Sequence, residues 1–142
     1  MRTFSCDIET DGLDPSVVWC IAVQDVDSGQ VITFSGTTLG LFKPWMASEV
    51  DCLVFHNGIG YDLPVLTRLC GIDFSDVQVE DTLVMSQLDK PRRDGGHSLA
   101  SWGERLGFDK GDHEDWSKFS EEMLTYCIRD TEITTKLYRH LK

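Results

Sequence analysis

Short apolar runs bounded by turn residues open the chain. Residues 2–8 and 17–27 are rich in β-branched and other apolar residues, and Gln30–Ser35 continues this pattern after a turn that ends in Gly29. Two such runs separated by a short Gly-containing turn are typical of a β-hairpin. The first quarter of the chain therefore predicts three strands in a meander.

The pattern changes from strand to helix and back in the next part of the chain. Residues 39–48 have helical spacing, with Pro44 inside or at the start of the helix. Cys52–His56 is a short continuous apolar run, which is typical of a strand buried on both faces. Because this fourth strand follows a helix, we expect it to be reached by a parallel crossover.

Helices predominate in the second half. Leu63–Cys70 has apolar residues at helical spacing and stops at Gly71, as a C-terminal glycine favours. A short strand at 77–80 and a helix at 82–88 are expected next.

Two polar loops then separate the last helices. Residues 89–96 form the clearest loop, and a helix at Leu99–Leu106 follows. Residues 109–115 (DKGDHED) are expected to be solvated surface. A long helix runs from about Ser120, a suitable N-cap, to Leu141. Strands that alternate with helices in this order predict an α/β fold in which a mixed sheet is flanked by helices.

Length and composition place the chain among small globular proteins. At 142 residues and 41% hydrophobic content, residues 1–142 suffice for a single domain. No apolar run approaches the roughly 20 residues that cross a bilayer, and no secretory signal opens the chain. Five scattered cysteines without a C-x-x-C pair indicate reduced, mostly buried thiols. We expect a soluble protein of the cytoplasm.

The charge balance argues against a broad nucleic-acid interface. The net charge is −11, from 24 acidic and 13 basic residues, whereas nucleic-acid binders are usually basic. Part of the acidity could be a metal site, whose cations reverse the local field. The one compact basic group is Lys90, Arg92 and Arg93, which either contacts phosphates or belongs to a solvated loop. If the chain binds nucleic acid at all, we expect the binding to be weak or assisted by a partner.

Two carboxylates close the first strand. Asp7 and Glu9 are two residues apart at the end of an apolar run, so strand periodicity points both to one face. Adjacent anions repel each other and are costly to desolvate, which a divalent cation between them would offset. The alternative is a solvated strand end.

Two further acids occupy positions with ordinary alternatives. Asp62 follows a two-glycine turn at the start of a helix, where an Asp is often only a cap. Tyr126 and Asp130 are four residues apart and so share a helical face. Taken alone, that pair could be a partly buried tyrosine beside a surface aspartate.

The three segments that carry these acids together resemble a known family. DIETDGL (residues 7–13), HNGIGYD (56–62) and YCIRD (126–130) resemble, in order, the three motifs of the DEDD (DnaQ-like) 3′→5′ exonucleases of the tyrosine subclass. Further segments resemble the proofreading domain of family A DNA polymerases from short-tailed bacteriophages. These are HNGIGYDLPVL, DTLVMSQL, HSLASWGERLG and WSKFSEEMLTY.

The resemblance implies a fold and a metal site. The fold would be RNase H-like, with a mixed five-stranded sheet whose second strand is antiparallel. Asp7, Glu9 and Asp130 would hold the tighter of two divalent cations, and Asp7 and Asp62 the second. Oxygen ligands favour Mg²⁺ or Mn²⁺. Tyr126 would orient the attacking water.

The resemblance also implies substrate contacts. Thr10, Gly12 and Leu13 would lie against the terminal sugar and base, with the leucine between the last two bases. The alternative for Gly12 and Leu13 is a turn and a core contact. Asn57 would touch the substrate strand or brace the site, and a turn role is equally open.

The expected function is metal-dependent hydrolysis of DNA from its 3′ end to nucleoside 5′-monophosphates. Because no polymerase follows in the sequence, we expect a stand-alone, phage-like enzyme with a role in replication or proofreading beside a separately encoded DNA polymerase. Three alternatives remain open: an RNA-trimming exonuclease on the same fold, a catalytically silent binding module, and an acidic protein that imitates DNA.

Overall fold

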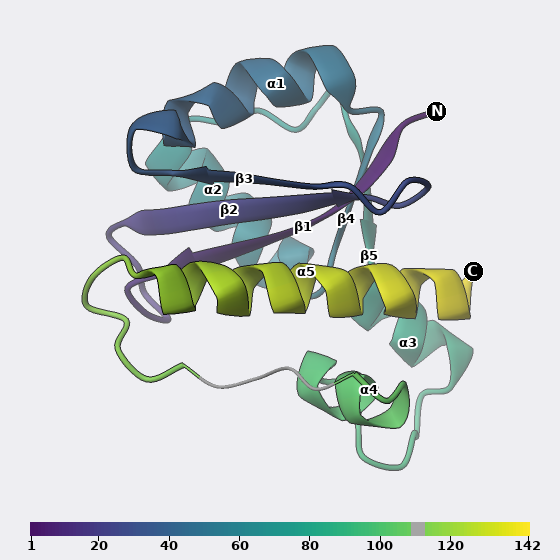
Figure 1. Ribbon diagram of the computed structural model, residues 1–142. Helices are drawn as coiled ribbons and strands as arrows, with labels where there is room; N and C mark the ends of the chain where they lie inside the picture. The colour runs from purple at the N-terminus through teal and green to yellow at the C-terminus, as the bar shows by residue number, and fades with distance from the viewer. Residues whose placement is uncertain (109–112) are drawn as a thin grey trace.

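A five-stranded mixed sheet forms the centre of the computed structural model, which describes residues 1–108 and 113–142 (Figure 1). The strand order is β3-β2-β1-β4-β5. The strands are β1 (Thr3–Thr10), β2 (Val18–Asp25), β3 (Val31–Ser35), β4 (Cys52–Phe55) and β5 (Gln78–Asp81). β2 is antiparallel to β1 and β3, and β4 is parallel to β1 and β5. The predicted mixed sheet with an antiparallel second strand is confirmed.

Helices cover both faces of this sheet (Figure 1). They are α1 (Phe42–Glu49), α2 (Leu63–Cys70), α3 (Thr82–Asp89), α4 (Leu99–Arg105) and α5 (Glu121–Leu141). Side chains of α1 and α2 share the largest hydrophobic core with β1 to β4. α5 lies across the other face, against β1 and β2, and packs with α3 and α4. Within the parts of the chain that the structure describes, no helix combines the length and apolar character needed to span a bilayer.

The helix expected at 39–48 differs in its first turn. Gly36–Leu41 is a 3₁₀ helix, and the α-helix begins only at Phe42. Thr38 fixes this start, because its hydroxyl accepts a hydrogen bond from the Ser35 N–H at 2.9 Å and donates one to the Ser35 carbonyl at 2.8 Å. Pro44 thereby falls in the first α-helical turn, where its missing N–H costs nothing.

The two faces of β1 pack against different helices. Phe4, Cys6 and Ile8 point into the core beneath α1 and α2. Ser5 points to the opposite face, where its hydroxyl lies 3.2 Å from the Thr131 carbonyl and 2.5 Å from the Thr135 hydroxyl of α5. Because side chains alternate along a strand, Asp7 and Glu9 also face α5.

Arg93 packs against the fold and holds the loop at residues 89–96 in place; its side chain does not extend into solvent. It is 8% exposed, and its guanidinium lies 3.8 Å from the centre of the Trp102 ring. It donates hydrogen bonds to the Gly96 carbonyl and, at 3.1 Å, to the Ser101 hydroxyl. Neither of the two predicted roles, a phosphate contact or a place in a solvated loop, holds for Arg93. Its neighbour Arg92 is exposed.

We predict that Arg93→Ala destabilises the fold by about 1–2 kcal/mol, because it removes a buried cation–π contact and two hydrogen bonds. Chemical denaturation followed by circular dichroism measures the change. The control is Arg92→Ala, which should leave the stability within about 0.5 kcal/mol of the parent. Equal stability of the two variants would contradict a structural role for Arg93.

Candidate active site

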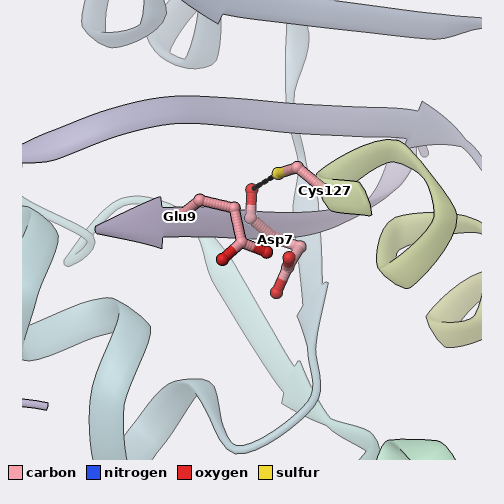
Figure 2. A group of neighbouring side chains, drawn as sticks. All are labelled: Asp7, Glu9 and Cys127. Carbon is pink, nitrogen blue, oxygen red and sulfur yellow. Dashed lines mark hydrogen bonds between the residues drawn. The ribbon is translucent and has the colours of Figure 1, made fainter. Parts of the chain in front are cut away.

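The end of β1 brings two carboxylates and a thiol together. Side-chain ligand atoms of Asp7, Glu9 and Cys127 all lie within 4.8 Å of one another, and Figure 2 shows the two carboxylates side by side. The Cys127 thiol donates a hydrogen bond to the Asp7 main-chain carbonyl at 3.4 Å. This bond ties α5 to β1 at the position of the carboxylates.

Asp62 enters the same region from β4. Parallel β1 and β4 end at the same edge of the sheet, and the π-helical turn Gly58–Asp62 follows β4 before α2 begins. Asp62 is 5% exposed. Burial raises the pKa of its carboxyl well above the ordinary value, and the charges of Asp7, Asp81 and Asp130 raise it further.

Asp130 completes the group of four carboxylates. It lies on α5 and is 4% exposed, and its charge contributes to raising the pKa of the Asp62 carboxyl. Tyr126 lies one turn earlier on α5 and is half-buried. Segments that are more than 50 residues apart in the sequence thus lie side by side, because β4 pairs with β1 and α5 packs against β1. The roles of their acids as metal ligands stay a prediction.

The donor chemistry of this site fits a hard divalent cation. Asp7, Glu9, Asp62 and Asp130 offer carboxylate oxygens, which Mg²⁺ and Mn²⁺ prefer. Within the described residues, Asp62 Oδ2 is buried and accepts no hydrogen bond. A buried acceptor left unsatisfied is costly, and a cation would supply its missing partner.

Asp81 braces the second motif, a role that sequence reasoning missed. Its carboxylate accepts hydrogen bonds from the N–H groups of Asn57 at 2.8 Å, Ile59 at 3.1 Å and Leu83 at 2.9 Å. It therefore caps α3 and holds the turn that carries Asp62. The signal was present in the segment DTLVMSQL, because an Asp before a helix is a common N-cap.

Asn57 has the turn role that the sequence left open. Its backbone is left-handed, with φ 63°, a conformation that asparagine tolerates better than most residues. The next residue must be glycine, because a Cβ on Gly58 would lie 2.3 Å from the Cβ of Phe55. The turn thus approaches the end of β4 closely. A substrate contact of Asn57 stays a prediction.

An open hollow of about 320 Å³ lies beside Glu9. Its lining residues are Ile8, Glu9, Thr10, Gly12, Leu13, Tyr61 and Trp116. The Tyr61 hydroxyl donates a hydrogen bond to the Gly12 carbonyl at 2.7 Å and lies 2.6 Å from the Thr10 hydroxyl. Leu13 is 96% exposed, so the alternative of a core contact is wrong for this residue.

An aromatic cluster stands between this hollow and Tyr126. The Trp116 ring packs edge-on against Tyr126, with centroids 5.6 Å apart, and His113 lies 4.6 Å from Trp116. Trp19 on β2 donates from Nε1 to the Trp116 carbonyl at 2.9 Å. We expected residues 109–115 to be solvated surface. That expectation is wrong for His113, which packs against Trp116. Residues 109–112 lie outside the described residues. Nothing in the residue spacing signalled this cluster.

Comparison with known proteins identifies the family. The family described as "3′-5′ exonuclease" matches residues 1–142. The chain belongs to this 3′→5′ exonuclease family. The predicted resemblance to DnaQ-like exonucleases of phage polymerases is confirmed, because the DNA-directed DNA polymerases of Escherichia phage T7 and Enterobacteria phage T3 are each 28% identical over 95% of the chain. The exonuclease spans 26% of each of these polymerases.

Solved structures confirm the RNase H-like fold. The family B DNA polymerase of Pyrobaculum calidifontis superposes with a TM-score of 0.75 at 16% identity, over 99% of this exonuclease and 24% of that chain. NrnC of Brucella melitensis bound to pGG superposes with a TM-score of 0.72 at 21% identity, over 98% of this chain and 71% of that chain. Phi29 DNA polymerase, in complex with primer-template DNA and nucleotide, superposes with a TM-score of 0.64 at 16% identity, over 96% of this chain and 30% of that chain.

The raised pKa of Asp62 predicts a stability that depends on pH. In the metal-free protein, the unfolded chain loses this proton near pH 4, whereas the folded chain retains it to higher pH. Stability therefore falls as pH rises above about 4. We predict that Asp62→Asn stabilises the metal-free protein at neutral pH by on the order of 2 kcal/mol, because it removes an uncompensated buried acid.

Thermal unfolding with a chelator measures this effect at neutral pH and at pH 4. The gain in stability from Asp62→Asn should be smaller at pH 4 than at neutral pH. Mn²⁺ should stabilise the parent more than the variant. A variant less stable than the metal-free parent at neutral pH would contradict the account of Asp62.

Proposed function

We propose that this exonuclease hydrolyses DNA from its 3′ end, releasing nucleoside 5′-monophosphates, with two divalent cations held by its four carboxylates. The observation that supports this best is the closeness of Asp7 and Glu9 at the end of β1, together with the buried Asp62, whose pKa the charges of Asp7 and Asp130 raise, beside an open hollow lined by Leu13. A cation site and a place for the 3′-terminal nucleotide adjoin each other there.

The carboxylates divide into two ligand groups. Asp7, Glu9 and Asp130 would hold the tighter cation, and Asp7 with Asp62 the second. When bound, such a pair supplies Lewis acidity to the scissile phosphate and its attacking water. The protein keeps the ligands in place by the Cys127 bond to Asp7 and by the Asp81 clamp on the second motif. Reaction geometry within about 1 Å is needed for full rate.

Tyr126 is the proposed positioning group for the attacking water. Its ring is held by Trp116, whose own backbone is held by Trp19. The hydroxyl of a ring fixed in this way can keep a water in line with the phosphate without acting as the base.

The hollow beside Glu9 is proposed to receive the terminal nucleoside. Leu13 and Trp116 offer apolar surface for the base, since base stacking on apolar and aromatic side chains is sequence-tolerant. Thr10 and Tyr61 form a hydrogen-bonded edge near the sugar. The resemblance to the phage polymerase domains supports DNA as substrate.

A second candidate is the trimming of short oligonucleotides, RNA included. A net charge of −11 disfavours contact with many phosphates, and a metal site that acts on phosphate does not distinguish the two sugars. NrnC, which shares the fold, was solved with pGG. A separately encoded polymerase as partner and a cytoplasmic location stay predictions.

Digestion of 5′-labelled strands tests the proposal. DNA and RNA of the same sequence, each as a long strand and as a dinucleotide, are incubated with Mg²⁺, Mn²⁺ or chelator. We expect a metal-dependent ladder that shortens from the 3′ end of DNA. Asp7→Asn should lose at least about 1,000-fold in rate, because the residue contributes to both cation sites, and Tyr126→Phe about 100-fold.

The matched control is Asp27→Asn in the exposed β2–β3 hairpin, which should keep full activity. A folded, Mn²⁺-binding protein that hydrolyses none of the four substrates would contradict the proposal. Hydrolysis confined to RNA or to dinucleotides would establish the second candidate.

Leu13 provides a separate test of the nucleoside site. Because its side chain is exposed beside the hollow, Leu13→Ala should leave stability unchanged. It should reduce kcat/KM by about 10-fold, as expected for the loss of one apolar base contact. Leu41→Ala is the control, since Leu41 is also exposed, at 57%, and lies in the 3₁₀ helix before α1. Equal kcat/KM for the two variants would remove Leu13 from the substrate site.

A further inference from the structure

One side chain at the proposed metal site, the thiol of Cys127, is a type of ligand that Mg²⁺ does not favour. The ligand atoms within 4.8 Å of one another are two carboxylates and the sulfur of Cys127. Thiolate is a soft ligand, which favours Zn²⁺ and Cd²⁺ and contributes little to the binding of Mg²⁺. The site therefore contains donors for two different classes of cation.

We propose that Asp7, Glu9 and Cys127 form a mixed oxygen and sulfur site for thiophilic divalent cations, so that Zn²⁺ or Cd²⁺ displaces the catalytic cation and inhibits the enzyme. This inference rests on the proposed function, because it assigns a second use to the same site. Cys127 is a ligand in this state only; with Mg²⁺ it remains the residue that ties α5 to β1.

The geometry allows this change with small movements. The Cys127 thiol is fully buried and donates to the Asp7 carbonyl, so its sulfur is already held beside the carboxylates. Zinc bonds of about 2.3 Å to sulfur and 2.0 Å to oxygen require the three groups to close in by about 1 Å. On binding, the thiol proton passes to water and the sulfur gains a bond to the cation.

A second observation indicates room for a cation at this place. Asp62 Oδ2 is buried in the same group of acids and accepts no hydrogen bond from the described residues. Asp62 is 5% exposed, and burial followed by the charge of Asp7 raises the pKa of its carboxyl. Asp62 can thus serve as a further oxygen ligand when a tetrahedral ion occupies the site.

Cd²⁺ titration of the whole protein tests the proposal through the ultraviolet thiolate-to-cadmium charge-transfer band. The parent should develop this band with the first equivalent of Cd²⁺. Cys127→Ser should lose the band and bind Cd²⁺ at least about 10-fold more weakly, and its loss of Cd²⁺ affinity should exceed its loss of Mn²⁺ affinity. Asp7→Asn should also lose the band, and circular dichroism confirms that each variant is folded.

Cys20→Ser is the matched control. Cys20 is buried in the same small cluster as Cys127 and is not among the three ligand groups, so this variant should keep the band. A band retained in Cys127→Ser would overturn the proposal. If Cys127→Ser does not fold, X-ray absorption of the Cd²⁺-loaded parent decides: a sulfur neighbour lost in Asp7→Asn supports the site, and an oxygen-only shell overturns it.

The outcomes separate this inference from the proposed function. Mn²⁺ binding and metal-dependent hydrolysis without a cadmium band would leave the exonuclease standing and remove only the thiophilic site. A protein that binds neither Mn²⁺ nor Cd²⁺ at Asp7 would contradict both.

Discussion

The mutual repulsion of buried carboxylates is the constraint on which the rest of this exonuclease depends. Asp62 and Asp130 are almost fully buried, and the charges of Asp7 and Asp130 raise the pKa of Asp62. A fold gains nothing in stability from gathering like charges out of water. The arrangement becomes favourable when divalent cations are present, so a part of the folding free energy is given up to form the proposed metal site.

Several elements outside the four acids oppose this repulsion. Ser5 bonds to Thr135 and so holds α5 against β1 below the site, and the Cys127 thiol does the same beside Asp7. Asp81 holds the turn after β4 through three N–H groups. The four acids are thereby attached to three elements, β1 with Asp7 and Glu9, the turn after β4 with Asp62, and α5 with Asp130. The distances between these elements are determined by the packing of the sheet against α5.

Much of the fold follows from local patterns. Alternation in residues 2–8 placed Asp7 and Glu9 on one face of β1, and helical spacing placed Tyr126 one turn from Asp130; both hold in the structure. The start of α1 was wrong because Thr38 stabilises a 3₁₀ turn through its own side chain, which periodicity does not reveal. Arg93 was misjudged because its burial depends on Trp102, which reaches it only in the folded chain.

The site was predictable as far as its motifs extend. The four acids and Leu13 could be proposed as site residues because each belongs to a short ordered motif. Trp116 and Cys127 were missed as contributors because their roles arise from contacts between segments far apart in sequence: Trp116 meets Trp19 across 97 residues, and Cys127 meets Asp7 across 120. Such contacts carry no signal in local spacing.

Crystals soaked in Mn²⁺ would test the central claim most directly, through the anomalous scattering of the bound ions. The account predicts one strong peak among Asp7, Glu9 and Asp130 and a second, weaker peak between Asp7 and Asp62. Anomalous density elsewhere on the protein, or none at these carboxylates in a Mn²⁺-saturated crystal, would contradict the assignment of this acid cluster as the metal centre.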